Sequence, residues 1–349
     1  MNHVVIMAGG VGSRFWPMST PECPKQFIDV LGCGRTFIQM TYDRFKGIVE
    51  PENVWVVTSD KYASIVHSQL PEIPQGNILL EPCRRNTAPC IAYVSWKIKA
   101  KDPNANMVVT PSDHMVTDVI KFQEVIKDTL KFTSETDAIV ILGMTPTRPE
   151  TGYGYIQADF TNPSLSSPGF VSVKQFKEKP DLKTAKMYVR QKEYLWNAGI
   201  FVWKAETIIQ ALRIFQPDIA SIFDAILPVL NTPGEQKAIN EEFPKCPNIS
   251  VDYAILEKAE EIYVYPASFG WSDVGTYGSL FTLLEKDENQ NAVVGQRVNL
   301  YDSSNCIIHT TDEKRVVVQG LDGYIVSEKD NTLLICKLSE EQRIKEFSE

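Results

Sequence analysis

VVIMAGGVGSRF, residues 4–15, places a short β-branched run directly before a loop that holds three glycines. The run VVIM (residues 4–7) predicts a buried strand. Glycine lets the backbone of the loop approach a ligand and point its N–H groups at an anion. Ser13 follows the glycines, and Arg14 and Lys25 add two long cations, so we expect a site for several phosphates. The glycines are Gly9, Gly10 and Gly12.

The loop differs from two common phosphate-binding loops. A Walker loop ends in Gly-Lys-Ser/Thr, whereas Ser13 and Arg14 follow Gly12 here. A dinucleotide-binding loop carries a third glycine where Phe15 stands. For the glycines alone, a turn without any ligand stays open as the alternative, and it is the two nearby cations that favour a nucleotide.

Short β-branched runs alternate with stretches of helical spacing through the first half of the chain. The expected strands are 4–7, 54–59, 77–80, 107–113 and 138–143, and the expected helices are 36–48, 61–70, 87–100 and 119–132. This alternation predicts a Rossmann-like α/β fold, with a mostly parallel sheet flanked by helices. In such sheets ligands bind beyond the carboxyl ends of the strands, so the residues that follow each strand are the candidates for chemistry.

The character of the sequence changes twice after residue 150. Residues 150–204 mix strand and helix patterns, which predicts a substrate-binding elaboration of the same domain. From residue 288 onward, short strands follow one another with turn residues between them. We therefore expect a catalytic domain of residues 1–287 and a small β domain of residues 288–349, with a β-solenoid as one candidate form.

Composition limits the function classes. With 349 residues, 43% apolar and 23% charged, the chain is typical of a globular protein with one large and one smaller domain. A net charge of −9 argues against nucleic-acid binding. We see no signal peptide or membrane span and expect a cytoplasmic protein. Seven cysteines without a CxxC pair and four scattered histidines predict neither a disulfide framework nor a zinc site.

The pattern GGxGxRxWPxS…PKQF resembles the signature of the sugar-1-phosphate nucleotidyltransferases, in the wording of the mannose-1-phosphate guanylyltransferases. Further motifs follow in order along nearly the whole chain: EPCRRNTAP (81–89), PSDH (111–114), ETGYGYI (150–156), EKP (178–180), WNAGIF (196–201) and WSDVG (271–275). The resemblance implies a GT-A-like nucleotidyltransferase domain. It also implies transfer of GMP from GTP to mannose 1-phosphate, giving GDP-mannose and pyrophosphate by a Mg²⁺-assisted, in-line single displacement.

The resemblance implies roles for the residues around the phosphates. Backbone N–H groups of the glycine loop, with Ser13, hold the triphosphate, and Arg14 stabilises the departing phosphates. Lys25 lies near the α-phosphoryl group, where charge builds up in the transition state. Asp113 and Asp273 hold one Mg²⁺, a cation that takes oxygen ligands. Without the motifs, a lone loop aspartate is more often a cap or turn residue.

The same resemblance implies a sugar subsite. Lys179 pairs with the phosphate of the sugar, and it completes the expected catalytic set of Arg14, Lys25, Asp113, Lys179 and Asp273. Glu178 and Asn197 bind sugar hydroxyls, and Gly154 lets the backbone approach the ring. A solvated Glu-Lys pair and a turn asparagine are the structural alternatives. Lys177 stands where the family has an apolar residue, so local packing is expected to differ.

Selection of the base is expected from the segment that follows the strand at 77–80. Glu81 is placed to accept both donors of the Watson–Crick edge of guanine, and Asn86 and Thr87 complete the nucleotide-binding set. A solvated turn glutamate is the alternative. Arg85 shapes this pocket or pairs with acidic surface groups.

Two other functions stay open at this stage. One keeps the reaction and changes the sugar, to a heptose or fucose 1-phosphate. The other is a non-catalytic regulatory homologue that binds a nucleotide sugar; the retained cations and carboxylates count against it. The expected partners are GTP and a sugar 1-phosphate, with no nucleic acid or membrane. The small β domain is expected to pack on the catalytic domain or to form a homodimer contact, and the sequence does not fix the oligomeric state.

Overall fold

The computed structural model describes residues 1–163, 169–311 and 314–348. The chain divides into two compact units that each combine distant segments. Unit 1 comprises Met1–Gly9, Tyr42–Pro111 and Val116–Trp271, and unit 2 comprises Gly10–Thr41, Ser112–Met115 and Ser272–Glu349. This division differs from the boundary predicted at 287/288, which stays a prediction. Residues 10–41 group with the C-terminal strands because Phe15 and Phe37 share one buried core with Tyr277 and Ile325.

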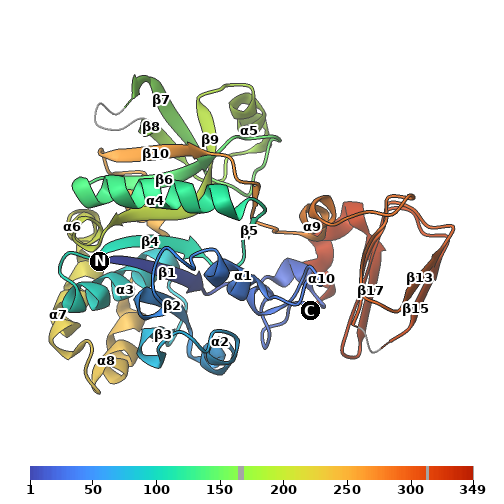
Figure 1. Cartoon of the computed structure of the whole chain (residues 1–349), viewed down its shortest axis with the longest axis horizontal. Helices are drawn as coiled ribbons and strands as arrows, with labels where there is room; N and C mark the ends of the chain where they lie inside the picture. The colour runs from blue at the N-terminus through green and yellow to red at the C-terminus, as the bar shows by residue number, and fades with distance from the viewer. Residues whose placement is uncertain (164–168, 312–313, 349) are drawn as a thin grey trace. The chain divides into compact units, whose positions relative to one another are not determined.

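Unit 1 contains a nine-stranded sheet in the order β3-β2-β1-β4-β9-β6-β10-β8-β7 (Figure 1). Its strands are β1 (Asn2–Ala8), β2 (Val54–Ser59), β3 (Ile78–Glu81), β4 (Asn106–Pro111), β6 (Ile139–Met144), β7 (Tyr155–Pro163), β8 (Val171–Lys177), β9 (Tyr194–Lys204) and β10 (Ile262–Ala267). The strands expected in the first half of the chain are therefore present as β1, β2, β3, β4 and β6.

The sheet is mixed. β1 pairs in parallel with β2 and β4, and β2 pairs in parallel with β3. β9 lies between β4 and β6 and is antiparallel to both. β10 is parallel to β6, whereas β8 is antiparallel to β10 and β7. The expected parallel order thus holds through β4, and it is interrupted where β9, from the substrate-binding part of the chain, enters the sheet.

Helices cover this sheet. They are α2 (Ala63–Gln69), α3 (Thr87–Lys101), α4 (Val119–Glu135), α5 (Leu182–Val189), α6 (Ala205–Phe215), α7 (Pro217–Ile226) and α8 (Glu235–Glu242); α1 (Phe37–Asp43) lies where the chain passes between the units. α3 is buried along most of its length because α6 and α7 pack against it. Inside this layer the ammonium of Lys97 donates to the carboxylate of Glu235, and so does the Tyr93 hydroxyl. The middle of α3 is therefore anchored by buried polar contacts.

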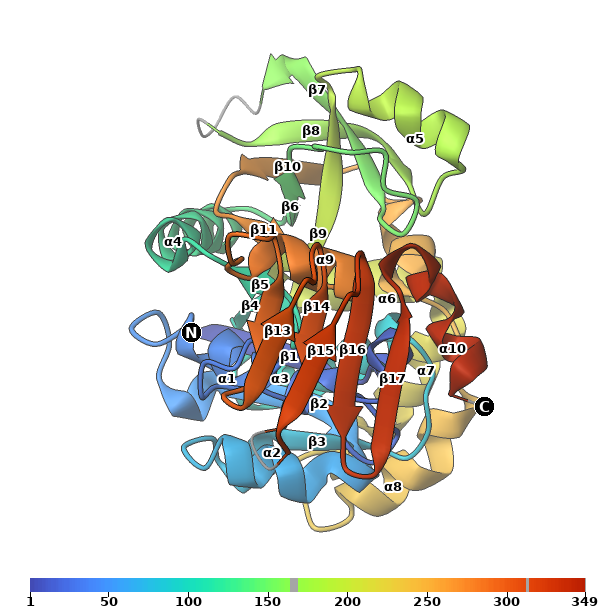
Figure 2. The same cartoon turned by 90° about the vertical axis from the view of Figure 1, so that its right-hand side faces the viewer.

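Unit 2 is built around short strands and the loop that follows β1. One sheet has the order β12-β14-β16-β17 and the other pairs β13 with β15 (Figure 2). The strands are β12 (Ala292–Val294), β13 (Val298–Tyr301), β14 (Ile307–His309), β15 (Val316–Gln319), β16 (Tyr324–Lys329) and β17 (Thr332–Lys337), with helices α9 (Tyr277–Leu283) and α10 (Ile344–Phe347). A capping box between Thr276 and Ser279 begins α9.

Two very short strands, β5 (Met115–Val116) and β11 (Trp271–Ser272), lie where the chain passes from one unit to the other. None of the helices in the described part of the chain has the length and apolar character that crossing a bilayer demands.

Candidate active site

The glycine loop leaves β1 at Ala8 and enters unit 2 at Gly10. Gly12 has φ = +68°, and a Cβ at this position would lie 2.6 Å from the Cβ of Lys25. Both facts require glycine, because an L residue would be strained and would displace the lysine. Ser13 and Arg14 begin a short 3₁₀ turn, Ser13–Phe15, and both are exposed. The loop therefore presents its hydroxyl and guanidinium to solvent, where a ligand can meet them.

Lys25 is buried at the centre of unit 2, with only 2% of its surface exposed. Its ammonium donates to the carbonyl oxygens of Asp273 and Val274, each at 2.8 Å. A carboxylate oxygen of Asp113 lies 3.1 Å from the same nitrogen. The three donors of the ammonium thus have three acceptors, taken from motifs that lie far apart in the sequence. The rings of Phe15 and Phe37 complete the enclosure, 5.5 and 5.0 Å from the nitrogen.

The carboxylate of Asp113 is held ionised. Burial alone raises its pKa, but the charge of Lys25 and, more weakly, of His114 outweigh burial, so that the net pKa is lowered. The side chain keeps 31% of its surface exposed, which leaves it open to a ligand on one side.

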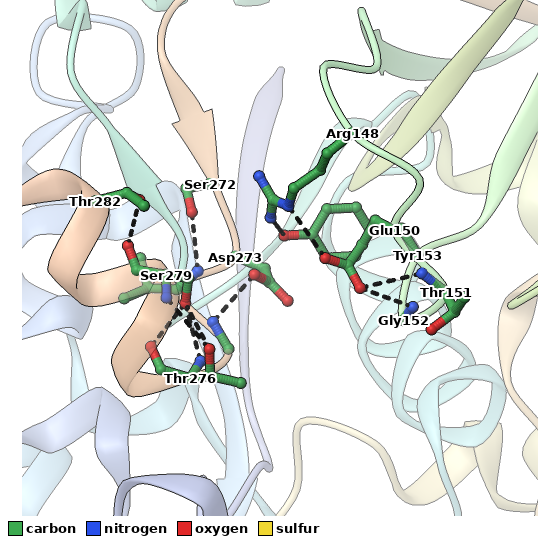
Figure 3. A network of polar contacts seen from close by, with 12 residues as sticks. Arg148, Glu150, Thr151, Gly152, Tyr153, Ser272, Asp273, Thr276, Ser279 and Thr282 are labelled. Carbon is green, nitrogen blue, oxygen red and sulfur yellow. Dashed lines mark hydrogen bonds and ion pairs between the residues drawn. The ribbon is translucent and has the colours of Figure 1, made fainter. Parts of the chain in front are cut away.

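Asp273 lies in a turn that its own side chain stabilises (Figure 3). Its Oδ1 accepts from the N–H of Gly275 at 3.0 Å, and the N–H of Val274 donates to the Ser272 hydroxyl at 3.2 Å. Val274 takes the left-handed conformation, with φ = +45°. This backbone shape directs two consecutive carbonyl oxygens at Lys25.

Asp113 and Asp273 fit a magnesium ion that is also bound by a substrate. Lys25 brings the two residues together, because its ammonium contacts the carboxylate of Asp113 and the main-chain carbonyl of Asp273. Carboxylate oxygens are the ligands that Mg²⁺ prefers. Within the described residues no three or more His, Cys, Asp and Glu side chains form a metal-binding group. Two carboxylates without a full protein cage suit Mg²⁺, which takes its remaining ligands from phosphates and water.

Glu81 ends β3 as a buried carboxylate with 8% of its surface exposed. Its Oε1 has no hydrogen-bond partner among the residues that the structure describes. Burial raises the pKa of Glu81 to about 7, although the Cys90 thiol and the charge of Arg84 act in the opposite direction. The alternative of a solvated turn glutamate is therefore excluded, and Glu81 is a carboxyl group poised between its two protonation states at neutral pH.

The segment after Glu81 shapes the start of α3. Asn86 adopts φ = +67° and caps the helix by accepting from the N–H of Thr87 at 2.9 Å. The Thr87 hydroxyl in turn accepts from the N–H of Val251 at 2.9 Å. The guanidinium of Arg85 donates to the carbonyl oxygen of Pro244. Asn86 and Thr87 thus have local structural contacts of their own, and Arg85 anchors the segment to unit 1 rather than pairing with surface acids.

Gly154, Glu178 and Asn197 come together in unit 1, as a common sugar subsite requires. A Cβ at Gly154 would lie 2.6 Å from Oε2 of Glu178 and 3.3 Å from the Cβ of Asn197. The N–H of Asn197 donates to the carbonyl oxygen of Gly154 at 2.8 Å. The ammonium of Lys179 lies 2.6 Å from the other oxygen of Glu178 and is exposed. Glu178 is therefore a buried acceptor with a cation at its solvent side.

Asp252 belongs to this cluster and was not predicted from the sequence. Its Oδ1 accepts from the side-chain amide of Asn197 at 3.0 Å. Burial, and then the charge of Glu178, raise the pKa of Asp252 to about 6. It begins a π-helical turn, Asp252–Leu256, an irregularity that is frequent at functional sites. Nothing in the local pattern SVDYAI marks it, because its partners come from β9 and the segment after β8.

Arg148 and Glu150 organise the loop before β7 (Figure 3). Glu150 accepts from the N–H groups of Thr151 and Gly152, each at 3.1 Å, and pairs with Arg148 at 3.2 Å. The guanidinium of Arg148 also lies over the ring of Tyr153, 5.9 Å from its centroid. The motif ETGYGYI contains Glu150, but the prediction from the sequence gave a role only to Gly154 of this motif. The loop that carries Gly154 is thus fixed by its own ion pair.

Comparisons with known proteins show the family of the chain. The nucleotidyl transferase family matches residues 3–290. A mannose-1-phosphate guanylyltransferase of Salmonella montevideo is 36% identical over 351 residues, covering 99% of this chain and 73% of that protein. The alginate biosynthesis protein AlgA of Pseudomonas syringae pv. tomato is 37% identical, covering 98% of this chain and 70% of that protein.

A solved structure from Thermus thermophilus, described as a mannose-1-phosphate geranyltransferase, has a TM-score of 0.88 and 28% identity, and covers 99% of this chain and 98% of that one. The likeness in fold therefore extends over nearly the whole chain, including its C-terminal part. On these grounds, the chain belongs to the nucleotidyl transferase family, among the mannose-1-phosphate guanylyltransferases.

Proposed function

We propose that this enzyme transfers GMP from GTP to mannose 1-phosphate and releases pyrophosphate. The observation that carries the proposal is the Lys25 ammonium, which joins Asp113 and the 273–274 turn. A cation and two carboxylates fixed beside a glycine loop suit phosphoryl transfer, in which the protein mainly positions groups and neutralises charge. The name of the Salmonella relative, a mannose-1-phosphate guanylyltransferase, supplies the two substrates.

The reaction needs no protein nucleophile. An oxygen of the sugar phosphate attacks the α-phosphorus of GTP in line, the bond to the bridging oxygen breaks, and pyrophosphate leaves. Backbone N–H groups of Gly10 and Gly12, with the Ser13 hydroxyl, bind the triphosphate. The exposed guanidinium of Arg14 stabilises the charge that gathers on the departing pyrophosphate.

Lys25 acts mainly as a positioning residue in this proposal. Its three donors are already engaged, so its charge orients Asp113 and the turn of Asp273 and adds positive potential for the phosphates. Asp113 and Asp273 would hold Mg²⁺, which supplies Lewis-acid stabilisation of phosphate charge when it is bound.

The sugar and the base are assigned to residues of unit 1. Glu178 and Asn197 accept and donate hydrogen bonds to sugar hydroxyls, Gly154 leaves room for the ring, and Lys179 pairs with the phosphate of the sugar. Ionised Glu81 accepts from guanine, next to the segment of Asn86 and Thr87.

A pyrophosphate-release assay tests the proposal. GTP is combined in turn with the 1-phosphates of mannose, glucose, fucose and a heptose, and ATP replaces GTP as the control. We expect the highest kcat/KM with GTP and mannose 1-phosphate. A higher value with fucose or heptose 1-phosphate would replace the sugar, and no release with any pair would favour a non-catalytic homologue.

We also infer that the small C-terminal domain is a short β-solenoid. The parallel pairs β12–β14–β16 and β13–β15 support it, because successive turns of a solenoid stack in parallel on alternating sheets.

A further inference from the structure

A cavity lies within unit 2, lined by residues other than those assigned to the reaction above. It has a volume of about 350 Å³, near the lower end of the range for small-molecule sites. Its wall comes from the loop after the glycine motif, with Met18, Ile28 and Asp29, and from the C-terminal strands, with His309 and Lys329 among others. No role in the proposed reaction uses this space.

His309 closes the cavity with an imidazole that is nine-tenths buried. Neither ring nitrogen has a partner at ordinary hydrogen-bond distance and angle among the described residues, although the main chain of Val30 lies near enough to the ring to favour its charged form. Burial lowers the pKa of His309 to about 4, with Lys329 acting in the same direction and Val30 and Asp29 in the opposite one. The ring is therefore neutral at pH 7, with one donor and one acceptor left to satisfy.

Thr310 adds a second unsatisfied group. Its hydroxyl is buried and, within the described part of the chain, forms no hydrogen bond. Gly295, with φ = +134°, brings its backbone close to this hydroxyl, since a Cβ there would lie 2.4 Å from it. Buried polar groups of native proteins are nearly always hydrogen-bonded, so two adjacent exceptions on one cavity wall call for a ligand or ordered water.

The remaining wall limits the chemistry of that ligand. Lys329 is the one lysine or arginine among the described lining residues, and its ammonium donates to the carbonyl oxygen of Met18 at 2.6 Å. Asp29 and Glu328 add two carboxylates, and that of Glu328 is paired with Lys314 at 2.6 Å, so the wall has no excess of positive charge to attract a phosphate or other anion. No Phe, Tyr or Trp belongs to the described lining to stack on a nucleobase.

Hydroxyl groups match this wall better than other polar groups. Each hydroxyl both donates and accepts, as a neutral imidazole and a threonine require, and the C–H faces of a sugar pack on Met18 and Ile28. We propose that the cavity is a second ligand site, which binds an uncharged polyhydroxylated molecule of monosaccharide size through His309 and Thr310. The proposal does not depend on the proposed function.

Imidazole NMR of protein labelled in its histidine rings tests this site directly. The chain has four histidines. His67 is exposed and His114 lies beside Asp113, so the signals of these two rings report on other parts of the protein. The intact enzyme is titrated with D-mannose, D-glucose and, separately, inorganic phosphate. We expect a saturable shift of the His309 signal with at least one of the two sugars and none with phosphate, while His67 does not move.

Thr310→Val supplies the second arm. Because the hydroxyl it removes has no partner among the described residues, the variant should fold normally, which thermal unfolding checks, yet it should bind the sugar about three- to tenfold more weakly. Thr282→Val, at an exposed position of α9, is the matched control and should bind as the wild type does. The proposal is overturned by a His309 signal that responds to neither sugar, by a response to phosphate instead, or by equal affinity in Thr310→Val.

Discussion

The Lys25 and Lys179 clusters contain the same chemical groups in opposite arrangements. In unit 2 the lysine is buried and its carboxylate partner, Asp113, is 31% exposed. In unit 1 the lysine is 61% exposed and its carboxylate partner, Glu178, is 8% exposed. Burying the cation fixes the geometry around it, whereas burying the carboxylates leaves the cation movable. Unit 2 thus holds a rigid centre, and unit 1 presents an exposed lysine, which in the proposed reaction follows a bound phosphate.

The two arrangements also differ in protonation. Lys25 lowers the pKa of Asp113 against the effect of burial. In the other cluster, burial and the nearby charge of Glu178 raise the pKa of Asp252 to about 6, and exposed Lys179 offsets this only in part. The buried ammonium of Lys25 therefore lowers the pKa of the carboxyl group beside it, whereas the exposed ammonium of Lys179 does not prevent burial from raising the pKa of Asp252.

Replacing each lysine in turn should show the difference between the two clusters most strongly, and Lys25→Met should have the larger effect on turnover and stability. Lys25→Met leaves Asp113 and two carbonyl groups without their shared donor, so we expect turnover to fall at least about a thousandfold. The free energy of unfolding should fall by about 2 kcal/mol, less than for a fully buried pair, because Asp113 is partly solvated.

Lys179→Met is the matched control for stability. Its lysine is exposed, so urea unfolding should change by less than about 0.5 kcal/mol, while KM for mannose 1-phosphate rises. Equal losses of stability in the two variants would contradict the difference drawn between the clusters.

Asp113→Asn and Asp273→Asn should each lower turnover by roughly a thousandfold, because each removes one anionic ligand of Mg²⁺. Circular dichroism should show an intact fold. Near-normal activity of both variants in Mg²⁺ would show that the metal assignment is wrong.

Glu81 extends the comparison to a buried carboxyl without a lysine. Below pH 7 it gains a proton and loses the ability to accept twice from guanine, so kcat/KM for GTP should rise as pH rises through about 7. Glu81→Gln should abolish this rise. It should also lower kcat/KM for GTP by about ten- to a hundredfold, and much less for ITP, which lacks the exocyclic amine.

Equal losses for GTP and ITP would show that Glu81 supports the pocket without binding the amine. Guanine selection would then fall to the backbone of residues 82–87.

Asp252→Asn should give the smallest effect. Because the folded-state pKa of about 6 lies above the ordinary value of 3.8, the folded protein binds more protons than the unfolded chain between these pH values. The free energy of unfolding should thus fall by about 1–3 kcal/mol from pH 4 to pH 7 in the wild type, and by less in the variant. Urea titrations at both pH values measure this; identical pH dependence would remove Asp252 as the cause.

The sequence predicted the parts of the site that lie in local patterns. The strand runs placed β1 to β4, and the motifs named Gly154, Glu178 and Asn197, which the structure brings together. The entry of antiparallel β9 into the sheet was not predicted, because pairing between distant strands leaves no local signal.

The burial of individual side chains also could not be predicted from the sequence. Lys25 was predicted as a cation facing phosphate, but its enclosure depends on Asp113 and on the turn at 273–274, 248 residues away. Asp252 was missed for the same reason, since its environment is made by Asn197 and Glu178. A side chain's pKa follows from such partners, which only the folded chain supplies.

Isotope exchange between radiolabelled pyrophosphate and GTP tests the central claim, direct transfer of GMP to mannose 1-phosphate, most directly. Without mannose 1-phosphate we expect no label in GTP, because no guanylyl-enzyme forms. Adding mannose 1-phosphate should start rapid exchange through reversible formation of GDP-mannose. Exchange in its absence would show a covalent intermediate, and no exchange in its presence would show that GMP is not transferred to this sugar.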